Sequence, residues 1–361
     1  MTGKATENQQ RVFMIDCIKG GASLLVVMQH AMSRAWDALG ASAPQSAEWL
    51  VMNAVFMLTR MAAPLFFLCS GALMLDGERT PKRIWKQNIP RIMMPYLSWM
   101  SVYGIRDVVR MMLAGDDRPG VLVNAFLKKI LFGHFHTWFL TALLGLYMIT
   151  PVIGPALCKV RVTVYAVLLS FFFTCCWPLI ERMDPVGRLD ALYDDLGLRV
   201  MTGFLLYYLA GRLLVIVPHS RNRRIVTMLA LAGGMIVAWW WSCTETMETG
   251  VVSQGSYTPL SWLGVLIACG IFYIAGGIPE PDRNGFPAKC VRLLSELNMG
   301  IYLIHPLFHE MVISRFQGLS SAAAGVLVWL IAIGICMPLY LNRWTRKVMF
   351  GITKSAIMDD E

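Results

Sequence analysis

The side chains best able to do chemistry lie in residues 11–34, RVFMIDCIKGGASLLVVMQHAMSR, which are mostly apolar but carry Asp16, Lys19, Ser23 and His30. In an α-helix the eleven-residue step from Lys19 to His30 is about three turns, so both side chains face the same way, about 16 Å apart along the axis. Asp16 and Ser23 fall close to the same stripe. Because ionisable groups are costly inside a membrane-spanning segment, this stripe indicates a functional site.

A second buried charge, Arg60, lies near the middle of the apolar segment 50–75. An arginine does not discharge itself, so it needs an anionic or carbonyl partner. One interpretation is a structural pair with Asp16 or with backbone carbonyls freed by Pro64. The other is a cation that holds substrate or orients the stripe of residues 16–30. Pro64 and Gly71 also predict a kinked, closely packed helix.

A basic run comes before the third apolar segment and contains Lys82, Arg83, Lys86 and Arg91. Such a run is typical of the cytoplasmic flank of a membrane span, where it contacts lipid headgroups. It could also attract a polyphosphate ligand such as coenzyme A. The sequence leaves both interpretations open.

Two further groups of polar side chains border or interrupt apolar spans. His134, His136 and Trp138 precede the fourth span, where we expect an interfacial aromatic belt. On a helix, residues i and i+2 diverge by about 200°, so we expect no metal site at the two histidines. In the ninth span, His305 and His309 share a helix face; each could be a core histidine bonded to a neighbouring helix, but two of them beside a carboxylate also fit a role in lining a pore. This span carries Ser295, Glu296, Tyr302, His305, His309 and Glu310.

Composition defines the elements that must position these residues. Hydrophobic residues make up 56% of the 361 residues and charged residues only 15%, whereas soluble domains carry about 25% charge. We therefore predict an all-α, polytopic membrane protein of about ten transmembrane helices. Residues 121–133 are apolar but too short to span and predict an interfacial or re-entrant helix. The predicted spans are 12–34, 50–75, 91–113, 136–157, 163–182, 198–217, 225–243, 258–278, 293–314 and 321–342.

The basic residues indicate an orientation. With the N-terminus inside, cytoplasmic segments hold 19 Lys and Arg residues and external segments hold 10. This bias predicts that both termini are cytoplasmic, with a short N-terminus at 1–11, a membrane domain at 12–342 and a tail at 343–361. The net charge of +9 is thus an orientation signal and does not indicate nucleic-acid binding. The nine cysteines show no metal-ligand spacing.

Several blocks, taken in order, resemble the integral-membrane acyltransferase-3 family. They are IDCIKG with QH in the first span, the arginine and PLFFLCSG in the second, PRIMMPYLSW, HTWFLTALLGLYMITP and SELNMGIYLIHP. The chain looks especially similar to stand-alone members that O-acetylate bacterial surface polysaccharides, such as the enterobacterial common antigen. The family's basic-x10-His signature falls on Lys19 and His30, and its mid-membrane arginine falls on Arg60. The family usually has arginine where this chain has Lys19, which replaces a planar fork with a point charge.

The resemblance implies an acyl transfer across the bacterial inner membrane. The donor would be cytoplasmic acetyl-CoA, or another short acyl-CoA, with its phosphates near the basic run of residues 82–91. The acceptor would be a hydroxyl of a lipid-linked or exported polysaccharide, such as O-antigen or another envelope glycan. No metal would take part. His30 would act as general base or as a transient acyl carrier, and Lys19 and Arg60 would stabilise negative charge. Substrate-binding residues would be Asp16, Ser23, Trp138, Tyr302 and His305.

Two other functions remain open from the residues alone. A secondary transporter of small polar solutes would also carry Asp, Lys, Arg and His within its spans, although the chain shows no inverted repeat. A lipid-binding structural protein would leave the stripe from Lys19 to His30 unexplained. Membrane lipids are expected neighbours in every case, and the sequence does not indicate an oligomeric state.

Overall fold

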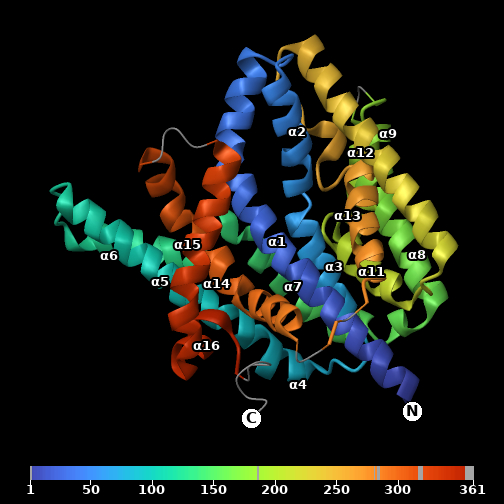
Figure 1. Ribbon diagram of the computed structural model, residues 1–361, viewed down its shortest axis with the longest axis horizontal. Helices are drawn as coiled ribbons and strands as arrows, with labels where there is room; N and C mark the ends of the chain where they lie inside the picture. The colour runs from blue at the N-terminus through green and yellow to red at the C-terminus, as the bar shows by residue number, and fades with distance from the viewer. Residues whose placement is uncertain (1, 185–186, 280, 283–284, 316–319, 354–361) are drawn as a thin grey trace.

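The structure, a computed structural model, describes residues 2–184, 187–279, 281–282, 285–315 and 320–353, and these form helices and no strand (Figure 1). The all-α prediction is thus confirmed. Short 3-10 and π turns connect or interrupt the helices. The longer elements are α1 (Thr2–Ser42), α2 (Ala47–Thr59), α3 (Ala62–Met74), α5 (Ile89–Leu113), α6 (Pro119–Phe132), α7 (Trp138–Ile153), α8 (Val160–Phe171), α11 (Leu205–Ile216), α12 (Arg221–Thr249), α13 (Trp262–Ala275), α14 (Phe286–Arg315) and α15 (Ser321–Leu341).

The shorter elements lie at the ends of the bundle or inside broken helices. We call the end that carries α4 and α16 the basic end; it is at the bottom of Figure 1. The turn from α1 to α2 lies at the opposite end. The shorter elements are α4 (Pro81–Arg83), η1 (Ile84–Asn88), η2 (Phe135–Thr137), η3 (Ala156–Cys158), η4 (Phe172–Cys176), α9 (Trp177–Glu181), α10 (Arg188–Asp195), η5 (Leu198–Met201), η6 (Gly255–Tyr257) and α16 (Arg343–Phe350).

Helices occupy each of the ten predicted spans, and the chain is a multi-pass membrane protein. Within the described residues, five helical stretches are long and apolar enough to cross a membrane. The helices α11 and α13 are shorter than expected, because Gly203 at φ +72° precedes the first and the Ser261 hydroxyl caps the second. The five stretches are Ala47–Met74, Pro119–Ile153, Val160–Glu181, Arg221–Thr249 and Ser321–Leu341.

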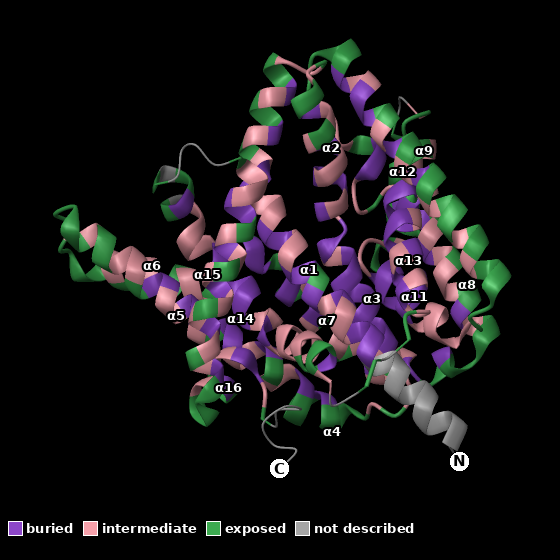
Figure 2. Ribbon diagram, viewed as in Figure 1, coloured by how far each residue is buried: buried purple, intermediate pink, exposed green. Residues whose placement is uncertain are grey.

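The centre of the bundle is built around α1, which packs against α2, α3, α14 and α15 (Figure 1). Buried residues concentrate there, whereas the outer faces of α8 and α12 are exposed (Figure 2). The helices α3 and α11 approach at two glycines. A Cβ at Gly71 would lie 1.8 Å from the carbonyl oxygen of Tyr208, and one at Gly211 would lie 2.1 Å from that of Leu68. Close packing at Gly71 is therefore as predicted.

The second span is interrupted at Arg60. The helix α2 ends at Thr59 and α3 begins at Ala62, so Arg60 lies in the break. Pro64 explains the position, because a proline has no N–H to donate to the carbonyl four residues earlier, which is that of Arg60. The predicted kink is present as a break one turn before the proline. It places a charged side chain where the helix is discontinuous.

The predicted short helix at residues 121–133 is α6, which packs on α5 and has no buried residue. Together α5 and α6 form an arm that projects from the side of the bundle in Figure 1. The arm exposes apolar side chains at both ends, since Leu113 at its tip is 83% exposed and Phe132 at its base is 81% exposed. This surface suits contact with lipid, as a short interfacial helix requires.

The predicted tail begins with α16, which packs against α5, α14 and α15. Asn342 caps this helix by accepting from the backbone N–H of Trp344 at 2.9 Å, and Phe350 at its other end is buried. The indole N–H of Trp99 donates to the carbonyl of Met349 at 3.1 Å. Gly351 ends the helix at φ +70°, with space for no Cβ against the Arg91 carbonyl. The start of the tail is thus part of the bundle.

Candidate active site

The functional stripe predicted on the first span lies on one continuous helix, α1, and its two ends reach different surroundings. Lys19 and His30 share a face of α1, about 16 Å apart along the axis. Lys19 lines a cavity that we call the Lys19 cavity. His30 joins a group of aromatic rings, His30, His134, His136, His305, Tyr103 and Tyr302, that we call the His30 cluster.

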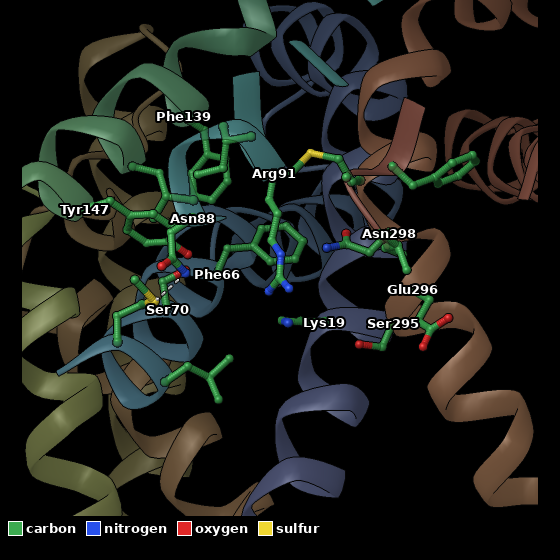
Figure 3. Close-up of a pocket in the computed structure, with 18 of the residues that line it drawn as sticks. Lys19, Phe66, Ser70, Asn88, Arg91, Phe139, Tyr147, Ser295, Glu296 and Asn298 are labelled. Carbon is green, nitrogen blue, oxygen red and sulfur yellow. Dashed lines mark hydrogen bonds between the residues drawn. The ribbon is translucent and has the colours of Figure 1, made fainter. Parts of the chain in front are cut away.

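The Lys19 cavity (Figure 3) has a volume of about 550 Å³ and lies toward the basic end of the bundle, because Asn88, Arg91 and Phe350 line it. One wall is aromatic and another is polar. Asp16 and Lys19 come from α1, and the hydroxyl of Ser295 donates to the Asp16 carboxylate at 2.6 Å. Further lining residues are Phe66, Ser70, Leu73, Met74, Arg79, Asn88, Arg91, Ile92, Phe139, Leu143, Tyr147, Glu296, Asn298, Met299, Phe350, Gly351, Ile352 and Thr353.

The charges in this cavity favour an anionic ligand. Figure 3 shows the Arg91 guanidinium pointing toward the Lys19 ammonium from the opposite wall. Among the described residues neither side chain forms an ion pair. Two cations that face each other repel, so an anion between them would stabilise both. The cavity is also lined by two carboxylates, and each already accepts a hydrogen bond: Asp16 from Ser295 and Glu296 from Tyr340.

The His30 cluster is tighter and mostly aromatic. The His30 ring stacks on that of His305 with centroids 5.3 Å apart, and Phe135 meets His30 edge-on at 5.1 Å. The His136 ring lies 5.5 Å from His305 and 5.3 Å from Tyr302. These contacts fix the plane of the His30 imidazole. His30 itself is half-buried, whereas His136 and His305 are buried.

Hydrogen bonds determine which ring nitrogens of the cluster are available. The Nδ1 atom of His305 lies 2.7 Å from the carbonyl oxygen of Tyr302. A carbonyl only accepts, so this Nδ1 carries the proton and the neutral ring presents a lone pair at Nε2. Within the described residues the buried Nε2 atoms of His305 and His136 make no hydrogen bond. Such unsatisfied nitrogens can accept or relay a proton.

Arg60 does not line the Lys19 cavity, but it acts electrostatically on the His30 cluster. It lies close enough to His30 and Tyr257 to interact electrostatically with both. Its buried Nε makes no hydrogen bond in the part of the chain that the structure describes, and no ion pair with Asp16 is formed there. The expected pair with Asp16 is therefore not formed, and the interpretation of Arg60 as a cation that acts on substrate stays a prediction.

Ser23 and Trp138, two other predicted site residues, lie outside the Lys19 cavity. Ser23 is fully buried; its hydroxyl donates to the Gly20 carbonyl at 2.7 Å and accepts from the Trp329 indole at 3.0 Å. It therefore joins α1 to α15. Trp138 is 46% exposed and packs on Phe204, with ring centroids 5.0 Å apart.

The basic run divides between two surroundings. A second cleft, which is lined by residues of η1, α5 and α16, adjoins the Lys19 cavity and shares Arg91 with it. Lys82 and Arg83 are exposed on α4 and line neither the cavity nor this cleft. Lys86 lines that cleft, and Arg91 lines both the cleft and the cavity. Of this run, Lys86 and Arg91 therefore face these two spaces, whereas Lys82 and Arg83 do not.

The prediction that the side chains of His134 and His136 point away from each other was wrong. The two Nδ1 atoms lie 3.0 Å apart, because His134 has an extended backbone and caps a 3-10 turn, η2, instead of an α-helix. The H-x-H spacing was the signal that could have found this pair. Within the described residues no group of three or more His, Cys, Asp or Glu side chains is arranged to hold a metal ion. Sequence reasoning also missed Tyr103, whose ring stacks on His134 at 4.7 Å.

Fold and site together define a multi-pass helical membrane protein with a polar cavity and a histidine cluster along one helix. A family model described as an acyltransferase domain, that of the acyltransferase-3 family, matches residues 13–341. The chain therefore belongs to the acyltransferase-3 family and is an acyltransferase. Searches of curated proteins and of solved structures found no match. Family membership resolves the choice between enzyme and transporter in favour of the enzyme.

Proposed function

We propose that this acyltransferase moves an acetyl or other short acyl group from cytoplasmic acyl-CoA to a hydroxyl of a lipid-linked or cell-surface polysaccharide. O-antigen or another envelope glycan is the expected acceptor, and the bacterial inner membrane the expected location. One observation carries the proposal: Lys19 and His30 lie on one face of α1, the first in an anion-attracting cavity and the second among buried histidines. This layout suits a charged donor at one end and a hydroxyl at the other.

The 16 Å step along α1 assigns different roles to the cations. Hydrogen-bonding groups must come within about 3 Å of their partner, so Lys19 does not touch an atom that reacts at His30. Lys19 would bind the donor, together with Arg91. Arg60, which is close enough to act electrostatically on His30, would stabilise the oxyanion that develops on the thioester carbonyl.

The reaction then needs one base. His30 accepts the proton of the acceptor hydroxyl while the hydroxyl oxygen attacks the thioester carbonyl carbon. The tetrahedral intermediate carries its negative charge on the former carbonyl oxygen, near Arg60. The C–S bond breaks, and the CoA thiolate leaves and takes up the proton that His30 accepted, which returns His30 to its neutral form. His305 would hold the His30 ring in position by stacking. In the alternative role of acyl carrier, His30 would attack the thioester first.

The orientation is part of this proposal. The bias of 19 Lys and Arg residues against 10 supports cytoplasmic termini, which would put the Lys19 cavity on the side where acyl-CoA occurs. A reporter enzyme fused after Glu361 should be active only if it is a type that works in the cytoplasm. Activity of a periplasmic reporter there would reverse the side from which the donor enters.

The chemical test is mass analysis of surface glycans. Cells with the protein should show a glycan heavier by one acetyl increment than cells without it, and cells carrying the His30→Ala variant should resemble the latter. Identical glycan masses in all three strains, with the wild-type protein present in the membrane, would contradict a glycan acceptor.

A further inference from the structure

A second cleft adjoins the Lys19 cavity at the basic end of the bundle. Its volume is about 1070 Å³, and it shares Arg91, Gly351 and Thr353 with the cavity. One wall comes from η1 and the first turns of α5, and the other comes from α16. A single elongated ligand can therefore occupy both spaces. The remaining lining residues are Lys86, Gln87, Pro90, Met94, Arg343, Arg346 and Lys347.

The cleft is strongly basic. Five of its lining residues are cations, Lys86, Arg91, Arg343, Arg346 and Lys347, and no lining residue is a carboxylate. Within the described chain, Lys86, Arg91, Arg343 and Lys347 form no ion pair. This concentration of one sign of charge in a concave site attracts a multiply charged anion.

The helix α16 holds its three cations in a fixed arrangement. Residues 343, 346 and 347 are spaced i, i+3 and i+4, so they share one face. The Asn342 cap and the contact of Gly351 with the Arg91 carbonyl tie both ends of the helix to the bundle. Arg343 and Lys347 are exposed, whereas Arg346 is buried. The cleft is therefore built by packing and does not depend on a loose tail.

Arg346 also links the cleft to the cavity. Its guanidinium lies over the Tyr340 ring, 5.7 Å from the centroid, and the Tyr340 hydroxyl donates to the Glu296 carboxylate. Glu296 lines the Lys19 cavity. Arg346, Tyr340 and Glu296 thus form one connected group. A ligand phosphate near α16 would contact its Arg346 end, and a ligand arm near Lys19 would contact its Glu296 end.

We infer that this cleft binds the nucleotide phosphates of the acyl donor, with α16 as one wall and the thioester arm extending into the Lys19 cavity. The inference rests on the proposed acyl-CoA donor and adds the C-terminal helix to its site. A nucleotide that bears a phosphate monoester in addition to its diphosphate is the ligand that five cations fit best. The monoester alone carries a charge of about −1.5 to −2 at neutral pH.

A variant pair with equal loss of charge tests this inference. Arg343→Gln with Lys347→Gln removes two exposed cations from the cleft. Lys159→Gln with Arg161→Gln removes two exposed cations that line neither space. These control positions are at the same end of the bundle, since the Cys158 thiol contacts the Asp76 carbonyl at 3.5 Å. Thermal unfolding of both variants checks that the fold is retained.

The measurements are binding of adenosine 3′,5′-bisphosphate in phosphatidylcholine nanodiscs and initial rates with three donors: acetyl-CoA, acetyl-dephospho-CoA and acetyl-pantetheine. The α16 variant should bind the bisphosphate about 10- to 100-fold more weakly than wild type, and the control variant should not. The KM for acetyl-CoA should rise by a similar factor, and that for acetyl-dephospho-CoA by less. Rates with acetyl-pantetheine, which lacks the nucleotide, should be equal in wild type and variant.

The outcomes separate this inference from the proposed function. If wild type transfers acetyl groups normally but the α16 and control variants bind the bisphosphate equally well, the cleft is not the phosphate site. If instead the α16 variant loses only affinity for anionic lipid added to the nanodiscs, the cleft binds lipid headgroups and the inference is overturned. If wild type binds the bisphosphate in an α16-dependent way but transfers no acyl group, the phosphate site stands and the proposed function fails.

Discussion

The surroundings of Lys19 and of His30, at the two ends of the stripe on α1, differ in volume, charge and packing. The Lys19 cavity has a volume of about 550 Å³, carries cations on opposite walls and continues into a basic cleft. The His30 cluster is tightly packed, with aromatic rings in contact and buried ring nitrogens that make no hydrogen bond within the described residues. The first arrangement is suited to hold a charged ligand, and the second is suited to move a proton. We therefore expect the donor to bind near Lys19 and the acyl transfer to take place near His30, at two different positions along α1.

The largest effect should come from His30. If it is the base, His30→Ala should lower the transfer rate by a factor on the order of 10² to 10⁴, because positioned acid–base groups contribute that much. Initial rates with saturating acetyl-CoA measure the loss. His219→Ala is the matched control, since the His219 ring stacks on Tyr273 outside the cluster. An equal loss in both variants would indicate a general effect of removing a histidine and not a base at His30.

Substitution of Arg60 should have the second-largest effect on the transfer rate. Arg60→Ala should lower the rate by a factor on the order of 10² to 10³ if the guanidinium stabilises the oxyanion, because removing one such donor costs that much. Arg60→Lys should recover part of the rate, since it keeps the charge without the planar fork. The KM for donor should stay close to the wild-type value. A rise in KM with an unchanged kcat would move Arg60 from the chemistry to donor binding.

Lys19 should show the opposite kinetic signature. Lys19→Ala should raise the KM for acetyl-CoA about tenfold while kcat changes only a few-fold, which marks loss of binding shared by ground state and transition state. Lys19→Arg should retain much of the activity, because arginine is the cation usual in the family. A large fall in kcat at saturating donor, with an unchanged KM, would place Lys19 in the chemical step and remove the distinction between the two ends.

Ser23 should have the smallest effect on catalysis, although it belongs to the predicted stripe. Its hydroxyl bonds to Gly20 and Trp329 and does not line the cavity. Ser23→Ala should change transfer rates less than twofold and lower the free energy of unfolding by about 1 to 2 kcal/mol, because it removes two hydrogen bonds that are each usually worth about 1 kcal/mol. A tenfold loss of rate at unchanged stability would show that the stripe acts as a continuous polar path.

Much of the fold follows from local properties of the sequence. Apolar length located the ten helices, and helical periodicity placed Lys19 and His30 on one face of α1. Pro64 predicted the kink because proline lacks a donor, and the break is found one turn earlier, at Arg60. Where local chemistry decides the geometry, sequence reasoning was sufficient.

The rest of the site depends on contacts between distant segments. Arg343, Arg346 and Lys347 lie in the predicted cytoplasmic tail, and the packing of α16 on α5 places them in one cleft with Arg91. The bond from Trp99 to Met349 joins positions 250 residues apart, and no spacing rule gives such a pair. The meeting of His134 with His136 needed the non-α backbone of η2, which periodicity does not report. These features are tertiary, so the sequence did not disclose them.

We infer that the donor binds near Lys19 and that the acyl group is transferred near His30. The most direct test is to measure donor binding and transfer on the same purified preparations of wild type, His30→Ala and Lys19→Ala. We expect His30→Ala to bind acetyl-CoA with wild-type affinity and to transfer almost none of it. We expect Lys19→Ala to bind about tenfold more weakly and to transfer most of what it binds. Normal transfer by folded His30→Ala protein would contradict the account, make the first span structural and direct the search for the base to Tyr302, His305 and His309.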